Sequence, residues 1–238
     1  MSTTRAIFFL SIVAACAFLA AESATGGSIT LDFNSLPSAQ GWNYFGVKTD
    51  GDPLPEASVY SVDGITLTQD MVGGDGDRVA YNILGVLDKG LPTVLRLRAR
   101  LTDYEPGTGG SRGLGFSVGM QDGDWIWQLN FTDTHMQASG GTFFPQDTTE
   151  FHDYRLEASP LGGFRLFIDG VLRETGTGTA ISSSSAIAFG DWSGTGENAD
   201  VEITEFSVTQ GIPEPGTFAM WTLAVGLGLV LRRRRRSK

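Results

Sequence analysis

Apolar residues recur at every second position through most of the chain. The clearest runs are Ile29–Phe33, Leu95–Leu101, Leu114–Val118, Trp125–Phe131, His152–Leu156 and Phe164–Ile168. Successive side chains of an extended backbone point to opposite sides, so a period of two predicts β-strands with one face in a core. Between the two ends of the chain no amphipathic stretch is long enough for a long helix.

The segments between these runs carry turn signals. Gly, Asp, Ser and Pro separate the runs, and Asp-Gly stands between apolar residues at 62–65 and at 168–171. Because Asp and Gly tolerate the positive φ angles of a two-residue primed turn, each pair predicts a tight β-hairpin. About a dozen short strands with tight turns favour an all-β fold, an antiparallel two-sheet β-sandwich.

The last predicted strand, 201–210, changes phase along its length. Its apolar residues are Val201 and Ile203, then Phe206 and Val208. One extra residue between the two pairs predicts a β-bulge near Thr204-Glu205.

The N-terminal segment has the features of a secretory signal peptide. Arg5 precedes the apolar run Ala6–Ala21, and Ala21-Glu22-Ser23 places small residues at the two positions that signal peptidase reads. We therefore expect a signal helix at residues 1–23, with cleavage after Ser23. The alternative is a lipobox that ends at Cys16, but apolar residues continue beyond this cysteine and favour the signal peptide.

The C-terminal segment joins three parts in a fixed order. Pro213, Glu214 and Pro215 come first, the apolar run Phe218–Leu231 follows, and Arg232–Arg236 come next. At about 1.5 Å per residue a helix of this run covers ~21 Å, short of the ~30 Å of a hydrocarbon core. The arginines predict a stop-transfer signal that stays in the cytoplasm. We expect a domain at 24–211 outside the membrane and an anchor with a transmembrane helix at 212–238.

These three parts resemble the PEP-CTERM sorting signal of Gram-negative bacteria. The resemblance implies that an exosortase recognises the segment, cleaves near Pro213, Glu214 and Pro215, and passes the protein to the cell surface or matrix. Gly216 stands where Ser is more usual in that family. The implied partners are exosortase and signal peptidase, and the implied location is secreted or cell-surface, with a transient inner-membrane anchor. The alternative is a plain membrane anchor without processing.

Segments of the predicted sandwich resemble the concanavalin A-like and laminin G-like domains of PEP-CTERM proteins. The resembling segments are Leu31–Trp42, Thr149–Leu156, Gly163–Gly170, Ala188–Asp191 and Val201–Thr204. The resemblance implies a concanavalin A-like jelly roll at 24–211. That fold serves sugar binding, protein binding, sugar cleavage and scaffolding, so it leaves the function open.

The charge of the predicted domain excludes several functions. Of the 17 Lys and Arg residues seven lie outside 24–211, as do two of the 27 Asp and Glu residues, which leaves 10 − 25 = −15. This acidic balance argues against a nucleic-acid-binding domain, which needs a basic face. The predicted domain contains no cysteine, which excludes disulfides, thiolate catalysis and zinc-thiolate sites in it.

The sequence offers only weak candidates for catalysis. A glycosidase needs two carboxylates on one face, and Glu202 and Glu205 lack a central Asp and have a spacing that separates them unless a bulge intervenes. Gly109–Gly113 fits Gly-x-Ser-x-Gly, but a nucleophile elbow needs a strand before it and a helix after it. His135 and His152 are the available bases, and a packed or hydrogen-bonded role is favoured for His152. We therefore expect no catalytic residues.

Two acidic turns are candidate calcium sites. Asp75 and Asp77 flank one glycine, and Asp122 and Asp124 flank another. Calcium takes six to eight oxygen ligands from flexible loops, and extracellular modules bind it weakly. The alternative is a pair of solvated turns, because Asp and Gly are ordinary turn formers.

A sugar site needs aromatic rings beside polar groups, since a flat ring covers the apolar face of a pyranose while polar groups orient its hydroxyls. The candidate aromatic residues are Trp42, Tyr81, Trp125, Trp127 and Trp192, with Asp124 and Gln128 close to two of them in sequence. For Trp125 and Trp127 core packing is favoured over ligand binding, because Leu129 and Phe131 continue their alternation.

These observations favour a non-enzymatic exported protein of the cell surface or matrix. Its expected function is adhesion, with loops that bind extracellular polysaccharide and with calcium as a candidate bridge to acidic polymers, which would otherwise repel an acidic protein. The alternatives are a carbohydrate-active enzyme with an unusual site and a structural protein without a ligand. A carboxylate pair in a groove would indicate the enzyme, and a surface without a cleft would indicate the structural protein.

Overall fold

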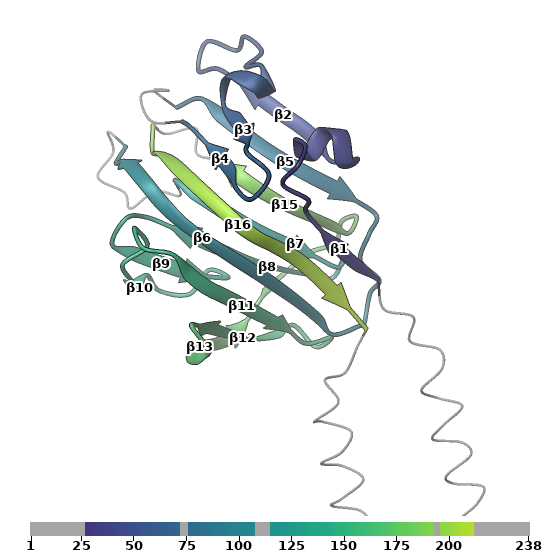
Figure 1. Ribbon diagram of the computed structural model, residues 1–238. Coiled ribbons are helices and arrows are strands. Elements are labelled where there is room, and N and C mark those ends of the chain that lie inside the picture. Colours follow the sequence, from purple (N-terminus) through teal and green to yellow (C-terminus); the bar gives the residue numbers. More distant parts are fainter. Residues whose placement is uncertain (1–26, 72–75, 108–114, 193–195, 212–238) are drawn as a thin grey trace, which may run out of the picture. The chain divides into compact units, whose positions relative to one another are not determined.

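The predicted strands are present and form two antiparallel sheets. The computed structural model describes residues 27–71, 76–107, 115–192 and 196–211 (Figure 1). The helices within these residues are two short 3-10 turns, η1 (Pro37–Gln40) and η2 (Glu56–Ser58). The all-β sandwich predicted from the sequence is therefore confirmed.

Sheet A contains the longest strands. Its order is β13 (Val171–Thr177), β12 (Gly163–Ile168), β11 (His152–Ala158), β6 (Thr93–Glu105), β16 (Asn198–Gln210), β4 (Leu67–Gln69) and β3 (Tyr60–Val62), with β1 (Ser28–Thr30) also paired to β16. Strands distant in sequence lie side by side, as β6 and β16 do at the centre, so the sheet depends on long-range pairing.

Sheet B carries the candidate site. Its order is β10 (Phe144–Pro145), β9 (His135–Ala138), β8 (Trp125–Phe131), β7 (Phe116–Gln121), β15 (Ala186–Asp191), β5 (Arg78–Leu84) and β2 (Asn43–Val47), with β14 (Thr179–Ala180) also paired to β8. Neighbouring strands are antiparallel throughout.

The core lies between the two sheets and is rich in aromatic rings. Phe206 of sheet A and Phe189 of sheet B have ring centroids 5.2 Å apart. Trp42 stands edge-on to both rings, with centroid distances of 5.6 Å and 5.4 Å. Each such pair contributes about 0.5–1.5 kcal/mol beyond the area that it buries, so these rings hold the sheets together.

The bulge predicted in the last strand is confirmed. The register of β16 against β6 shifts between Ile203 and Glu205, which leaves Thr204 as the extra residue. Ile203 and Phe206 therefore both face the core, although they are three positions apart. The bulge also turns Glu202 and Glu205 to the same outer face of sheet A, where Glu202 pairs with Arg100 at 2.8 Å.

Both predicted hairpins are present, but only one of them has the predicted two-residue turn. Asp169 and Gly170 have φ angles of 51° and 77°, as a two-residue primed turn requires. At the other site Val62 pairs with Leu67, so the loop has four residues, 63–66. There the Asp63 carboxylate accepts the backbone N–H groups of Ile65 and Thr66, which lowers the pKa of Asp63 and stabilises the longer loop.

The two predicted terminal helices lie outside the described residues. Cys16, Pro213, Glu214 and Pro215 belong to these segments, so the signal peptide, the sorting signal and the transmembrane helix remain predictions. The described residues separate from both ends as a unit at Gly27–Gln210. No helix within that part of the chain is long and apolar enough to cross a membrane.

Candidate functional site

A cavity of about 360 Å³ opens on the outer face of sheet B, the face that points away from the core. We call it the sheet B cavity. Its lining residues are Asn82, Leu84, Ser117, Gly119, Met120, Gln121, Ile126, Gln128, Ala186, Ala188 and Trp192. They come from β5, β15, β7 and β8, four neighbouring strands, and from the residue that follows β15.

The floor of the cavity consists of small side chains on the two middle strands. Ala186 and Ala188 lie on β15, and Gly119 lies beside Ala188 on β7. A Cβ atom added at Gly119 would have its nearest neighbour at 3.5 Å, so glycine here leaves room above the sheet rather than relieving a clash. Longer side chains on the flanking strands rise beside this floor, and the difference in length forms the cavity.

The two walls carry amides that neighbouring side chains hold in place. By strand register Asn82, Ala188, Gly119 and Gln128 form one row across the sheet, with an amide at each end. Asn82 Oδ1 accepts a hydrogen bond from Asn43 Nδ2 at 3.2 Å. Gln128 Nε2 donates to Asn130 Oδ1 at 2.7 Å. These bonds order the amides before any ligand arrives, which reduces the entropy lost on binding.

The hydrogen bonds continue from Gln128 across the neighbouring strands. Ser117 Oγ donates to the same oxygen of Asn130 at 2.9 Å, and Asn130 Nδ2 donates to Gln137 Oε1 at 2.9 Å. Gln137 Nε2 donates to the carbonyl of Gly141 at 2.7 Å. The wall amide at Gln128 is therefore one end of a chain of side chains that is anchored to the backbone.

Trp192 supplies the aromatic ring of the cavity. It follows β15 directly, and 41% of its surface is exposed, which is unusual for so large a side chain. A ring at this position can cover the apolar face of a sugar, while amides of the walls bind hydroxyl groups.

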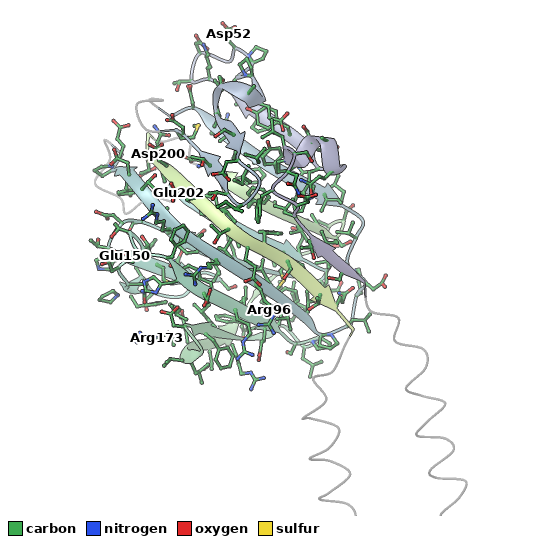
Figure 2. The ribbon with its side chains drawn as sticks, in the orientation of Figure 1. Asp52, Arg96, Glu150, Arg173, Asp200 and Glu202 are labelled. Atoms are coloured by element: carbon green, nitrogen blue, oxygen red, sulfur yellow. The ribbon has the colours of Figure 1, made fainter. Side chains whose placement is uncertain are left out.

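Among the described residues that line the cavity, none has an ionisable side chain. The outer face of sheet A differs, because it carries ion pairs such as Arg98–Asp153 at 2.7 Å and Arg100–Glu202 at 2.8 Å. Figure 2 looks onto that face and labels Arg96 and Glu202 among its charged side chains. The two outer faces of the sandwich therefore differ in charge as well as in shape.

Two residues predicted to contact a ligand, Tyr81 and Trp127, lie in the core and are fully buried. Burial, followed by its hydrogen bond to Glu56, raises the pKa of Tyr81. Trp127 donates its Nε1–H to the carbonyl of Gly162 at 2.9 Å. The core packing favoured for Trp127 is therefore confirmed, and ligand binding is wrong for Tyr81. Their strands turn these large rings inward and turn the amides of Asn82 and Gln128 outward.

Of the other three candidate aromatic residues, two pack against the core and one lines the cavity. Trp42 is 4% exposed and belongs to the core. Trp125 packs partly buried against the core, with its ring on Gly162, and it lies outside the cavity lining. Trp192 is the predicted ligand-binding residue that lines the cavity. Three lining residues were not predicted from the sequence: Asn82, Ser117 and Gly119. The pattern that could have identified them is that small or uncharged polar residues alternate with the core residues of β5 and β7.

The described candidate calcium residues, Asp77, Asp122 and Asp124, do not form a cluster. Asp124 pairs with Lys89 Nζ at 2.6 Å, and Asp122 Oδ1 accepts the backbone N–H groups of Asp124 and Trp125, as in an ordinary turn. Asp77 accepts the backbone N–H of Thr49, and Asp75 lies outside the described residues. Over the described ranges no group of three or more His, Cys, Asp and Glu side chains could hold a metal ion.

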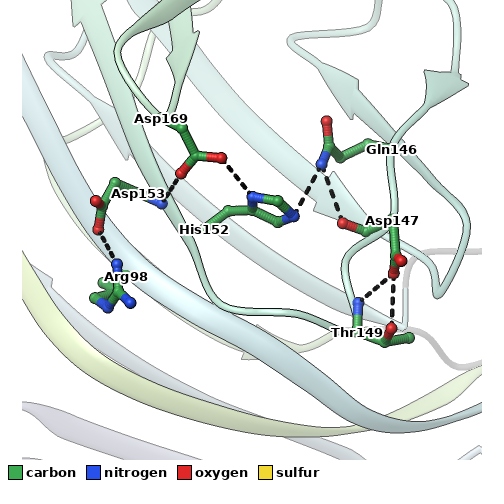
Figure 3. Close-up of polar contacts among 7 residues, drawn as sticks. All are labelled: Arg98, Gln146, Asp147, Thr149, His152, Asp153 and Asp169. Atoms are coloured by element: carbon green, nitrogen blue, oxygen red, sulfur yellow. Dashed lines mark hydrogen bonds and ion pairs between the residues drawn. The ribbon is translucent and has the colours of Figure 1, made fainter.

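His152 belongs to a hydrogen-bond network (Figure 3). Its Nδ1 lies 2.6 Å from Asp169 Oδ2, and its Nε2 lies 3.1 Å from Gln146 Nε2. An amide nitrogen only donates, so His152 accepts at Nε2 and donates from Nδ1 to Asp169. Asp169 Oδ1 also accepts the backbone N–H of Asp153 at 3.0 Å. The network joins β11 to the turn between β12 and β13, which is a structural role. Ser111, the other catalytic candidate, lies outside the described residues.

No protein-family model and no curated protein sequence matches the chain. Among solved structures it is similar to an endo-β-1,3-glucanase from Pyrococcus furiosus, with a TM-score of 0.50, 13% identity, and coverage of 77% of this chain and 94% of that chain. A sialidase has a TM-score of 0.49, 14% identity, and coverage of 76% of this chain and 18% of that chain. The lectin UEA-II in complex with galactose has a TM-score of 0.46, 13% identity, and coverage of 78% and 99%. At these identities the likeness to the glucanase concerns the fold alone.

Proposed function

We propose that the protein is an exported, non-enzymatic carbohydrate-binding protein and that it holds glycan in the sheet B cavity. One observation carries the proposal: the described lining of the cavity combines an exposed tryptophan with ordered amides and includes no carboxylate. Carbohydrate binding by protein pockets uses this combination, in which a ring covers the sugar and a few polar groups orient it.

The lining argues for binding without hydrolysis. A glycosidase of the usual kind needs two carboxyl groups, about 5–9.5 Å apart, on either side of the scissile bond. None of the described residues that line the cavity can act as acid, base or nucleophile in that reaction. Glu202 and Glu205 share a face, but that face belongs to sheet A and not to the cavity.

A binding experiment on the full-length chain tests the proposal. We expect binding to neutral or mixed glycans on an array, and we expect Trp192→Ala to weaken it about tenfold, which corresponds to ~1.4 kcal/mol of lost stacking. Gly119→Leu should abolish binding, since it fills the floor. Leu161→Ala is the control, because Leu161 is 86% exposed and lies outside the lining. Binding that survives both cavity variants would contradict the site.

The non-enzymatic part has its own measurement. Incubation of the protein with each bound glycan should release no new reducing ends. Release that disappears in Gly119→Leu would show an active site in this cavity and would refute the proposal.

The export part rests on the end segments of the sequence. Two features of the sequence support it: the apolar run after Arg5, and the C-terminal succession of Pro213, Glu214 and Pro215, an apolar run and a cluster of arginines. Mass spectrometry of the native protein from the culture medium or cell surface should find the N-terminus near residue 24 and the C-terminus near Pro213–Pro215. Native protein in the cytosol with both ends intact would refute export.

A further inference from the structure

The two wall amides of the sheet B cavity come from its flanking strands, β5 and β8. Asn82 and Gln128 stand at the ends of one row, three strand spacings apart. At ~4.8 Å per spacing, their backbones lie about 14 Å apart. A sugar ring that rests on Ala188 and Gly119 is therefore within reach of both side chains.

No described residue in the cavity lining is charged, and the two described cations considered next do not reach this row. Arg78 is on the same strand as Asn82, but four residues along β5 at ~3.3 Å each separate the two by about 13 Å, more than the ~8 Å Debye length at physiological salt. The ammonium group of Lys89 forms an ion pair with Asp124 at 2.6 Å, so its charge is already balanced. The whole chain has a net charge of −10. A carboxylate in the cavity would meet neither an adjacent cation in the lining nor a favourable overall field.

The lining therefore discriminates by charge. A carboxylate that leaves water without a partner loses its hydration and gains little in return. A hydroxyl group both donates and accepts, and an amide wall can satisfy it in either role. From this geometry we infer that the sheet B cavity takes an uncharged glycan and rejects uronate-containing ones, with Asn82 and Gln128 as the specificity-determining residues. This inference rests on the proposed function of the same site.

Matched sugars test the inference on the full-length chain. The probes are hexamers of mannose and mannuronate, of galactose and galacturonate, and of glucose and glucuronate, measured by titration calorimetry at about 20 mM and about 500 mM NaCl. We expect a neutral hexamer to bind with an affinity that changes less than about twofold between the two salt concentrations. Its uronate partner should bind at least about tenfold more weakly.

A charge placed on the wall should change the preference. Gln128→Lys should strengthen binding of the uronate hexamers at least about tenfold at low salt and lose that gain at high salt. Asn82→Lys is the second variant, should Gln128→Lys fail to fold. Leu161→Lys is the matched control, because Leu161 is 86% exposed and lies outside both the cavity lining and the chain of amides.

The possible results distinguish a failure of the charge preference from a failure of carbohydrate binding itself. The inference would be overturned if a uronate hexamer and its neutral partner bound the unmodified protein with equal affinity and Trp192→Ala abolished the binding of both. Carbohydrate binding in the cavity would then still stand. An equal gain from Leu161→Lys and Gln128→Lys would also overturn it, because the attraction would not come from the cavity. No binding of any hexamer or array glycan would refute the proposed function and the inference together.

Discussion

Deletion of Thr204 should be far more damaging than its replacement by alanine. Thr204 is the extra residue that lets β16 present Val201 and Ile203, and then Phe206 and Val208, to the core. Without it, one of these two pairs must turn to solvent. Loss of burial for two large apolar side chains costs roughly 1.5–3 kcal/mol each, or about 3–6 kcal/mol. A domain of this size is stable by about 5–15 kcal/mol, so the deletion removes a large share of that stability.

The matched control keeps the backbone and removes the side chain. Thr204 Oγ1 is buried without a hydrogen-bond partner among the described residues, so Thr204→Ala should change the free energy of unfolding by less than about 1 kcal/mol. Denaturant unfolding of the full-length chain, followed by tryptophan fluorescence, measures both variants. The reasoning fails if the deletion unfolds within about 1 kcal/mol of the unmodified protein.

Three further perturbations test other parts of the fold. Gly162→Ala should lower the melting temperature by several degrees, because φ is +85° and the new Cβ would lie 2.5 Å from the Trp125 ring; an unchanged melting curve would contradict this packing. Burial acts to raise the pKa of Asp169, but hydrogen bonds from a backbone N–H and from His152 lower it overall. The stability that Asp169 contributes is present above its unfolded pKa and is lost as the pH falls through its folded pKa, so Asp169→Asn should flatten the acid side of a stability–pH profile. Burial raises the pKa of Glu174, whose contribution is greatest below its unfolded pKa and is lost as the pH rises through its folded pKa. Glu174→Gln should therefore stabilise the protein at neutral pH relative to acid, and equal effects at both pH values would contradict this.

Local patterns in the sequence predicted the strands but not which of their residues meet at a site. The alternation of apolar residues on β8 and β16 is a property of each strand, and so is the phase change at Thr204. The Asp-Gly pair at 169–170 likewise acts through its own φ angles. The pair at 63–64 has the same letters, but the carboxylate of Asp63 binds the backbone further along the loop and stabilises a longer turn.

The cavity depends on contacts that no single segment encodes. Ala188 lies beside Gly119, and Gly119 beside Gln128, only because β15, β7 and β8 pair in one register. In the sequence of β8, Trp127 is the residue that suggests a ligand site, because it is a large aromatic. In the structure Trp127 faces the core, and its neighbour Gln128 faces the cavity. Trp192 could be named from the sequence because an aromatic ring in a loop after a strand is a candidate binding group whatever the register.

The bonds that hold the wall amides also fix which way round each amide sits. Asn82 receives a hydrogen bond at its oxygen, so its nitrogen is on the opposite branch, while Gln128 gives one from its nitrogen and has its oxygen on the opposite branch. Under the proposed function, the Asn82 end of the row would present a donor to a sugar and the Gln128 end would present an acceptor. A glycan that spans the row would therefore meet chemically unlike groups on its two sides.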